Sequence, residues 1–230
     1  MIKTNYKKGV SWIKKHRFKL LLASTILVLV LPALAAANDI LRVILFVISM
    51  SFLLIQSIIV ATEKKAKRPW LRYSIVVIMI IIFWLEPLGI KIPLLEDFKL
   101  LIIVVFFVFV TYYLVKFMRK SARVDVDVII TAVNIYLLMG IISGSLAFLF
   151  YQTFPDAYNF PTYISEPNFV NFNYYSFVTM STVGYGDITP RLPQTQTLSY
   201  LIAVAGQLYV AIIMAFLVGK LLMHGQEDEK

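Results

Sequence analysis

The hydrophobic positions of this chain gather into six long runs that short polar segments separate. The runs cover residues 20–37, 43–62, 73–85, 100–115, 128–150 and 198–219. A helix that crosses a bilayer needs about 20 mostly apolar residues. The third run is short, and it must extend through Trp70 and past Glu86 to span the hydrocarbon core. The pattern predicts an all-α membrane protein with six transmembrane helices.

The composition excludes a water-soluble domain. Apolar and aromatic residues make up 60% of the 230 residues, and charged residues make up only 15%. The mean hydropathy is +0.79. A small soluble fold buries only a limited fraction of its surface and cannot hide so much apolar area. The chain has no cysteine, which excludes disulfides, thiolate metal sites and a thiol nucleophile.

The basic residues predict the orientation of the chain in the membrane. With the N-terminus inside, 18 of the 22 Lys and Arg residues fall on the cytoplasmic side, and only Arg42, Lys91, Lys99 and Arg191 fall outside. Short cytoplasmic loops carry such an excess of Lys and Arg. We therefore expect a multi-pass protein of the plasma membrane with both termini in the cytoplasm. The net charge of +9 then needs no nucleic-acid partner.

The N-terminus allows one alternative. Basic residues, an apolar core at residues 20–31 and Ala35-Ala36-Ala37 together resemble a secretory signal peptide. Cleavage there would remove residues 1–37 and leave five spans. The basic region is long and the apolar run continues for 18 residues, so we favour a retained first span. The intact mass of the purified protein distinguishes the two.

The segment between the fifth and sixth runs contains a shorter apolar stretch, residues 171–181. We expect Asn171 or Asn173 to be its N-cap. As a helix it is about 12–15 Å long, too short to cross a bilayer, so it predicts a re-entrant half-helix. Residues 182–187 follow it, with the sequence Thr-Val-Gly-Tyr-Gly-Asp.

The spacing of Gly184 and Gly186 has a physical interpretation. Successive carbonyls point the same way only if alternate residues adopt left-handed or mirror conformations, which glycine does without steric penalty. The expected product is a ladder of carbonyl oxygens from Thr182, Val183, Gly184 and Tyr185. Several such chains around one axis would form rings that replace the hydration shell of an ion. The negative end of the half-helix dipole would favour a cation there.

Residues 179–187, Thr-Met-Ser-Thr-Val-Gly-Tyr-Gly-Asp, resemble the selectivity filter of tetrameric potassium channels. The resemblance covers about residues 126–222. It implies a homotetramer whose permeant ion is K⁺, bound at Thr182, Val183, Gly184 and Tyr185, with Gly186 completing the filter. A nonselective relative has Asp in place of Tyr185, so this tyrosine favours potassium selectivity.

The same resemblance divides the chain. Residues 1–124 would form a basic cytosolic N-terminus and a four-helix transmembrane region, and residues 125–230 the pore domain. Within the pore domain we expect an outer helix at about 126–150, a pore helix at about 172–181, the filter at 182–187 and an inner helix at about 196–221. We call residues 182–187 the filter segment.

Further positions take roles from the resemblance. Asp187 matches the acid of the outer mouth, and Gly206 falls where the family often places a gating hinge. Filter support is expected from Tyr174, Tyr175, Val178, Thr179 and Ser181. Three of these depart from the family pattern. Tyr174-Tyr175 replaces a common Trp-Trp pair, and Val178 replaces a glutamate, so Asp187 lacks that partner. These departures bear on filter stability and slow inactivation.

The first four runs look like a degenerate voltage sensor. A sensor needs several Arg or Lys residues inside its fourth span, and residues 100–115 contain none. The leading hypothesis is therefore a passive potassium channel and not an enzyme, with no cofactor. The alternatives are a membrane subunit of a potassium-uptake transporter and a voltage-gated potassium channel.

The sequence also predicts lipid-binding or packing roles for several other residues. An anionic lipid is a candidate partner of the basic cluster Lys64, Lys65, Lys67, Arg68 and Arg72. Polar residues within spans usually bond between helices, which we expect of Gln56 and Asn134. The pair Gly140 and Gly144 has the spacing of a helix-packing motif, and we interpret it that way.

Overall fold

The computed structural model describes residues 12–13, 15–35, 38–62, 69–85, 87–90, 93–121, 123–164 and 166–225. Its longer helices are α2 (Arg17–Leu34), α3 (Asp39–Ala61), α4 (Pro69–Leu85), α5 (Pro93–Lys120), α6 (Val126–Thr153), α7 (Phe169–Met180) and α8 (Pro193–Gly225). A short 3₁₀ helix, η1 (Pro155–Ala157), and two strands, β1 (Tyr158–Asn159) and β2 (Thr189–Pro190), lie between α6 and α8.

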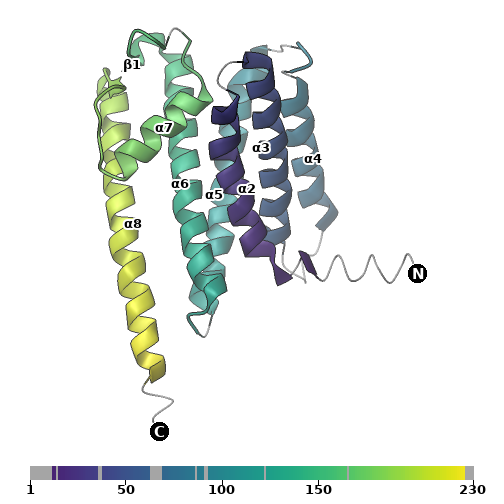
Figure 1. Ribbon diagram of the computed structural model, residues 1–230, viewed down its shortest axis with the longest axis vertical. Helices are drawn as coiled ribbons and strands as arrows, with labels where there is room; N and C mark the ends of the chain where they lie inside the picture. Colours follow the sequence, from purple (N-terminus) through teal and green to yellow (C-terminus); the bar gives the residue numbers. More distant parts are fainter. Residues whose placement is uncertain are drawn as a thin grey trace, which may run out of the picture.

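Helix α6 is the central element of the arrangement. It packs against α2 and α5 on one side and against α7 and α8 on the other. Figure 1 shows α2 to α5 as a bundle beside α6, with α8 at the opposite edge. Helix α7 crosses obliquely between α6 and α8 near one end of the molecule (Figure 1), which we call the α7 end. The C-terminal end of α8 lies at the other end of the molecule.

Among the described residues, five helical segments are long and apolar enough to cross a membrane: Arg17–Leu34, Ile40–Ala61, Phe98–Lys120, Val126–Thr153 and Pro193–Lys220. The described part of the chain adds one shorter apolar helix, Arg72–Leu85. The 17 residues of α4 extend only about 26 Å at 1.5 Å per residue, which is less than the ~30 Å core of a typical bilayer. The residue ranges given above thus contain five long apolar helices and a sixth that is short.

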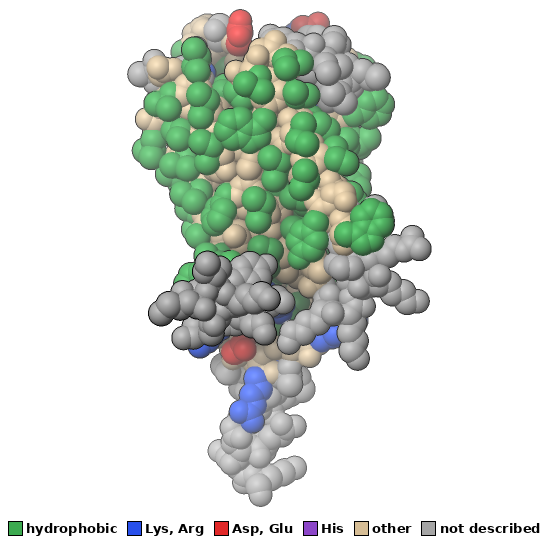
Figure 2. Space-filling model, turned by 90° about the vertical axis from the view of Figure 1, so that its right-hand side faces the viewer, with side chains coloured by type: hydrophobic (Ala, Val, Ile, Leu, Met, Phe, Trp, Pro, Cys, Tyr) green, Lys and Arg blue, Asp and Glu red, His purple; other side chains and the backbone are tan. Residues whose placement is uncertain are grey.

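The surface fits a multi-pass membrane protein. Figure 2 shows hydrophobic side chains across the middle of one face, and Lys and Arg side chains mainly toward the C-terminal end. On α4 the exposed side chains include Ile75, Val77, Ile78 and Ile81. Apolar residues that face outward along whole helices are stable in lipid and not in water.

One core joins the four-helix side to α6. Its fully buried members include Leu21 of α2, Leu53 of α3, Phe107 of α5 and Leu138 of α6. A second cluster lies at the α7 end and contains Ala157, Tyr158, Phe172, Tyr175 and Ile188. The second cluster fixes the loop after α6 against α7.

Polar residues inside the bundle follow the expectations in part. Asn134 Nδ2 donates to the carbonyl of Phe18 at 3.1 Å and to that of Ile130 at 3.0 Å. The first of these bonds joins α6 to α2, so the predicted interhelical bond of Asn134 is confirmed. Gln56 is buried as well, yet its Oε1 has no hydrogen-bond partner among the described residues.

Of the predicted lipid-binding cluster, Lys64, Lys65, Lys67 and Arg68 lie outside the described residues. Arg72 is described, and its guanidinium is used within the protein. It donates to the carbonyl of Ala61 at 3.1 Å and to the hydroxyl of Tyr113 at 3.2 Å. It also lies over the ring of Tyr113, 5.5 Å from the centroid. Arg72 therefore joins α3, α4 and α5.

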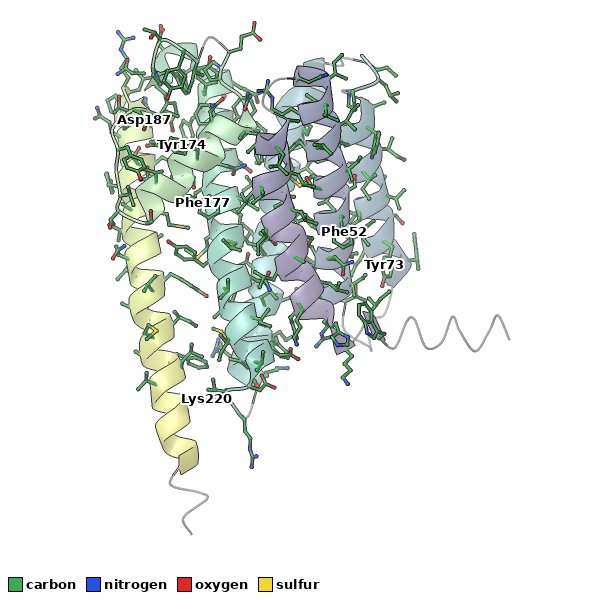
Figure 3. The ribbon with its side chains drawn as sticks, viewed as in Figure 1. Phe52, Tyr73, Tyr174, Phe177, Asp187 and Lys220 are labelled. Atoms are coloured by element: carbon green, nitrogen blue, oxygen red, sulfur yellow. The ribbon has the colours of Figure 1, made fainter. Side chains whose placement is uncertain are left out.

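The structure adds two features to an all-α fold. Strands β1 and β2 pair antiparallel, with Tyr158 opposite Pro190 and Asn159 opposite Thr189. At the C-terminal end of α8, Lys220 Nζ donates to the carbonyl of Ser121, which follows α5; Figure 3 labels Lys220 there. Two-residue strands have no periodicity, so the sequence pattern did not predict them.

Candidate functional site

Helix α7 leads directly into the filter segment, and its start differs from the prediction. The N-cap is Asn168, and Asn168 and Asn171 form a capping box. Asn171 Oδ1 accepts from the backbone N–H of Asn168 at 3.0 Å. The predicted N-cap, Asn171 or Asn173, is therefore wrong, because the helix begins earlier and Asn171 is its third residue. Its 12 residues extend about 18 Å, still too short to cross a bilayer.

Two glycines of α6 let α7 lie close. A Cβ atom on Gly140 would be 2.3 Å from the ring of Phe177, and one on Gly144 would be 2.6 Å from Oδ1 of Asn173. Ser176 Oγ donates to the carbonyl of Gly140 at 2.8 Å, which joins the two helices. The predicted packing role of this glycine pair is confirmed, with α7 as the partner helix.

Gly206 of α8 faces the other end of α7. A Cβ atom there would lie 2.3 Å from the carbonyl oxygen of Met180, the last residue of α7. Within α8, which is one continuous helix from Pro193 to Gly225, the glycine thus permits close approach of a backbone carbonyl. The sequence interpretation of Gly206 as a hinge did not include this contact.

The backbone of the filter segment alternates. Gly184 has a φ of +56° and Gly186 a φ of +77°, in the region that favours glycine. A Cβ atom at either position would meet nothing within 4 Å, so conformation and not space requires glycine there. Thr182 also has a positive φ, +62°. Such a value is rare for a β-branched residue. The sequence analysis did not predict it, although Thr182 lies two residues before Gly184 and so continues the spacing of Gly184 and Gly186.

The end of α7 anchors the first part of this segment through its carbonyls. Thr182 N donates to the carbonyl of Thr179 at 3.0 Å. The N–H groups of Val183 and Gly184 donate to the carbonyl of Val178 at 3.1 and 3.2 Å. Val178 thus contacts the filter segment through its backbone. Ser181 Oγ donates to the carbonyl of Phe177 at 2.7 Å, within the last turn of the helix.

Side chains of the filter segment are open in a single chain. Val183 is 52% exposed and Tyr185 is 72% exposed. In a single chain, the rest of the protein covers neither side chain.

Asp187 has a partner that the sequence did not predict. The hydroxyl of Tyr174 donates to Asp187 Oδ2 at 2.7 Å, and Asp187 Oδ1 accepts from the N–H of Ile188 at 3.0 Å. Figure 3 labels Tyr174 on α7 and Asp187 beside it. The hydrogen bond to Asp187 raises the pKa of Tyr174 to about 12, because loss of the proton would break it. Tyr174 thus bonds to Asp187, whose expected glutamate partner is replaced by Val178 in this chain.

Tyr175 joins α7 to α8. Its hydroxyl is hydrogen-bonded to Ser199 Oγ, and burial raises the pKa of Tyr175. Its ring packs edge-on against Tyr158, with the centroids 5.4 Å apart. Close by, Thr195 Oγ1 donates to the carbonyl of Ala157 at 3.0 Å. These contacts hold α7, the loop after α6 and the start of α8 together.

Residues 128–222 match the model of a protein family described as an ion channel. This part of the chain is similar to ion channels. The match begins in α6, includes α7 and the filter segment, and ends in α8, so it supports an ion channel and not an enzyme. No curated protein and no solved structure matches the chain.

Proposed function

We propose that four copies of this chain form a potassium-selective channel that conducts K⁺ passively. The observation that carries the proposal is the alternation of positive φ at Thr182, Gly184 and Gly186, directly after the capped helix α7. Such alternation turns successive carbonyls toward one side of the strand. The similarity of residues 128–222 to ion channels supports a pore built from this segment.

In this mechanism the protein supplies carbonyl oxygens in place of water. The carbonyls of Thr182, Val183, Gly184 and Tyr185 face the axis and form successive rings around the ions. Carbonyl dipoles in such rings replace the hydration shell of K⁺. The C-terminal end of α7, at Met180, carries the negative end of its helix dipole and favours a cation nearby. Asp187 attracts cations to the mouth.

The need for several copies follows from what one chain leaves open. A single strand provides one carbonyl at each level, which cannot surround an ion. The apolar window of α8 is only 11% buried, against 33–44% for the other four candidate spans. Neighbouring copies would cover α8, Val183 and Tyr185 together. One filter segment per chain and the family resemblance give the number four.

The membrane arrangement is part of the proposal. Helix α4 spans as the sixth helix, with α7 re-entrant between α6 and α8. The excess of Lys and Arg in loops on one side favours a location of both termini on the cytoplasmic side of a plasma membrane. The α7 end, with Asp187, is then the outer end of the protein.

Ion flux from liposomes that contain the purified protein tests this function. We expect K⁺ and Rb⁺ to pass and Na⁺ to be excluded, and equal K⁺ and Na⁺ flux would refute selectivity. Tyr185→Asp should raise Na⁺ permeability. The matched control is Tyr163→Asp, which places the same charge on a tyrosine that is 78% exposed in the preceding loop. The native mass should be four times the 26.3 kDa of one chain.

A further inference from the structure

Gln207 places a carboxamide in the middle of the apolar part of α8. It is the fifteenth of the 28 residues in the candidate span Pro193–Lys220. Between Ser199 and Lys220, no other residue has an amide or a charged side chain. The side chain of Gln207 is exposed, and it forms no hydrogen bond with the part of the chain that the structure describes. An amide in apolar surroundings is unfavourable unless it is hydrogen-bonded.

Gly206 fixes the depth of Gln207 relative to the filter segment. A Cβ atom on Gly206 would lie 2.3 Å from the carbonyl oxygen of Met180, the last residue of α7. Thr182, the first residue of the filter segment, follows two positions later. Figure 1 shows this end of α7 against α8. Since one residue of a helix rises only about 1.5 Å, Gln207 lies at nearly the depth where the filter segment begins.

The side of α8 that carries Gln207 faces away from the rest of the chain. Tyr209 marks the packed side, because its hydroxyl donates to the carbonyl of Ala132 in α6 at 2.6 Å. Two residues of an α-helix are about 200° apart, so Gln207 lies nearly opposite Tyr209. Met214 and Val218 follow Gln207 by close to two and three full turns. They are 56% and 48% exposed, so this side of α8 is open along its length.

Three surroundings are available to an open helix side in a membrane: lipid, a neighbouring protein surface and the water of a pore. Lipid tails offer no hydrogen-bond partner to the amide of Gln207. A neighbouring α8 that presented the same side would offer mainly apolar residues such as Met214 and Val218. Water satisfies both the oxygen and the NH₂ group of the amide. Polar residues within spans characteristically face such water-filled spaces.

We propose that Gln207 of each copy faces a water-filled pore directly below the filter segment, where the Oε1 atoms form an additional ring of cation ligands. This inference rests on the proposed channel. A carboxamide oxygen accepts hydrogen bonds as a backbone carbonyl does, and such oxygens can replace the water around K⁺. The C-terminal end of α7 at Met180 adds negative partial charge at the same depth.

The ring acts on occupancy and not on selectivity. K⁺ that enters from the cytoplasmic side binds to the amide oxygens of Gln207 before it passes to the carbonyls of Thr182. The torsions of a glutamine side chain rotate, so its oxygen adjusts to a smaller ion as well. We therefore expect Gln207 to increase the K⁺ concentration near the filter segment and to leave the ratio of K⁺ to Na⁺ permeability unchanged.

Single-channel recording of the full-length protein in planar bilayers tests the ring, with K⁺ varied on the cytoplasmic side. Gln207→Met keeps an unbranched side chain and removes the amide. The K⁺ concentration at half-maximal conductance should rise about fivefold, the factor that corresponds to one hydrogen bond, at an unchanged ratio of K⁺ to Na⁺ permeability. Gln207→Glu adds a negative charge and should lower this concentration. The matched control is Ile212→Met: Ile212 is 65% exposed but lies about 140° from Gln207 around the helix, and its substitution should change nothing.

The absence of cysteine from the sequence allows a second test that does not require conduction. In liposomes with a cationic, membrane-impermeant methanethiosulfonate on both sides, Gln207→Cys and Met214→Cys should react. Ile212→Cys, on a different side of the same helix, should not. The intact mass of the protein records each reaction, and native mass shows that the variant is assembled like the unmodified protein.

No reaction at Gln207→Cys, or equal reaction at Ile212→Cys, would overturn the pore-facing position of Gln207. Unchanged half-maximal K⁺ concentrations in both Gln207→Met and Gln207→Glu would overturn the cation ring. If Gln207→Met does not assemble, Gln207→Asn makes the same comparison, with a smaller rise because its amide is retained on a shorter side chain. Failure of the unmodified protein to pass K⁺ would instead contradict the proposed function.

Discussion

The hydroxyl of Tyr174 donates a hydrogen bond to Oδ2 of Asp187 at 2.7 Å, across 13 positions of the sequence. Tyr174 belongs to α7 and Asp187 follows the last glycine of the filter segment. The bond therefore joins the helix before the filter segment to the residue directly after it. Rotation of α7 relative to the filter segment would break it.

We expect Tyr174→Phe to destabilise the conducting conformation of the filter without changing the ratio of K⁺ to Na⁺ permeability. The lost hydrogen bond contributes about 1 kcal/mol, which is about fivefold in the balance between conducting and non-conducting filters. Decay of K⁺ current or flux with time measures it. Tyr174→Trp keeps a donor and should recover part of the effect, whereas Tyr163→Phe is the exposed-tyrosine control. Unchanged decay in Tyr174→Phe would contradict the role of this bond.

The same bond predicts a pH dependence. The pKa of Tyr174 is raised from 10.0 to about 12. A raised pKa means that folding favours the protonated hydroxyl, so its contribution is complete below pH 10.0 and is lost as pH rises through about 12. The difference in tyrosinate absorbance between wild type and Tyr174→Phe should therefore have its midpoint near 12. A midpoint near the ordinary value of 10.0 would show that the hydroxyl is not bonded to Asp187.

Two glycines of α8 allow a matched comparison of how an added methyl group changes protein stability. A Cβ at Gly206 would lie 2.3 Å from the carbonyl oxygen of Met180, whereas a Cβ at Gly219 would meet nothing within 4 Å. We expect Gly206→Ala to destabilise the protein by about 1–3 kcal/mol, as overpacking does. Gly219→Ala should be neutral or stabilising by up to about 1 kcal/mol, since alanine is the better helix former. Thermal unfolding measures both, and equal melting temperatures would refute the close contact.

Positive φ at Gly184 predicts a specific loss of conduction. Gly184 at +56° and Gly89 at +76° both have no neighbour near an added Cβ. Alanine is strained at either position, by about 1 kcal/mol or more. Because Gly89 lies outside the filter segment, Gly89→Ala should retain K⁺ flux and Gly184→Ala should lose it. Loss of flux in both variants would indicate a general folding defect instead.

Arg72 distinguishes a structural role from a simple positive charge. Its guanidinium donates both to the carbonyl of Ala61 and to the hydroxyl of Tyr113, a fork that lysine cannot reproduce. We expect Arg72→Lys to lower stability by about 1 kcal/mol, although the charge is kept. Tyr113→Phe removes one acceptor and should have a smaller effect. If Arg72→Lys melts like the wild type, only the charge matters at this position.

The sequence pattern predicted the structural features that depend only on residues close together in the chain. The apolar runs marked the helices, because every transmembrane segment must be apolar along its length. The spacing of Gly184 and Gly186 predicted alternating backbone, since only glycine tolerates positive φ freely. The spacing of Gly140 and Gly144 indicated close packing of helices. Each of these signals lies within a few consecutive residues and does not depend on the path of the chain.

Contacts between distant segments required the tertiary structure. Asn168, Asn171 and Asn173 all lie near the start of α7, and only the observed first residue of the helix selects Asn168 as the N-cap. The bond between Tyr174 and Asp187, and the carbonyl of Met180 against Gly206, depend on how the chain returns past α7. The sequence by itself thus determined the helices and the alternating strand, because their causes are local. The tertiary structure alone decided which residues support that strand, because their partners meet only after the helices pack.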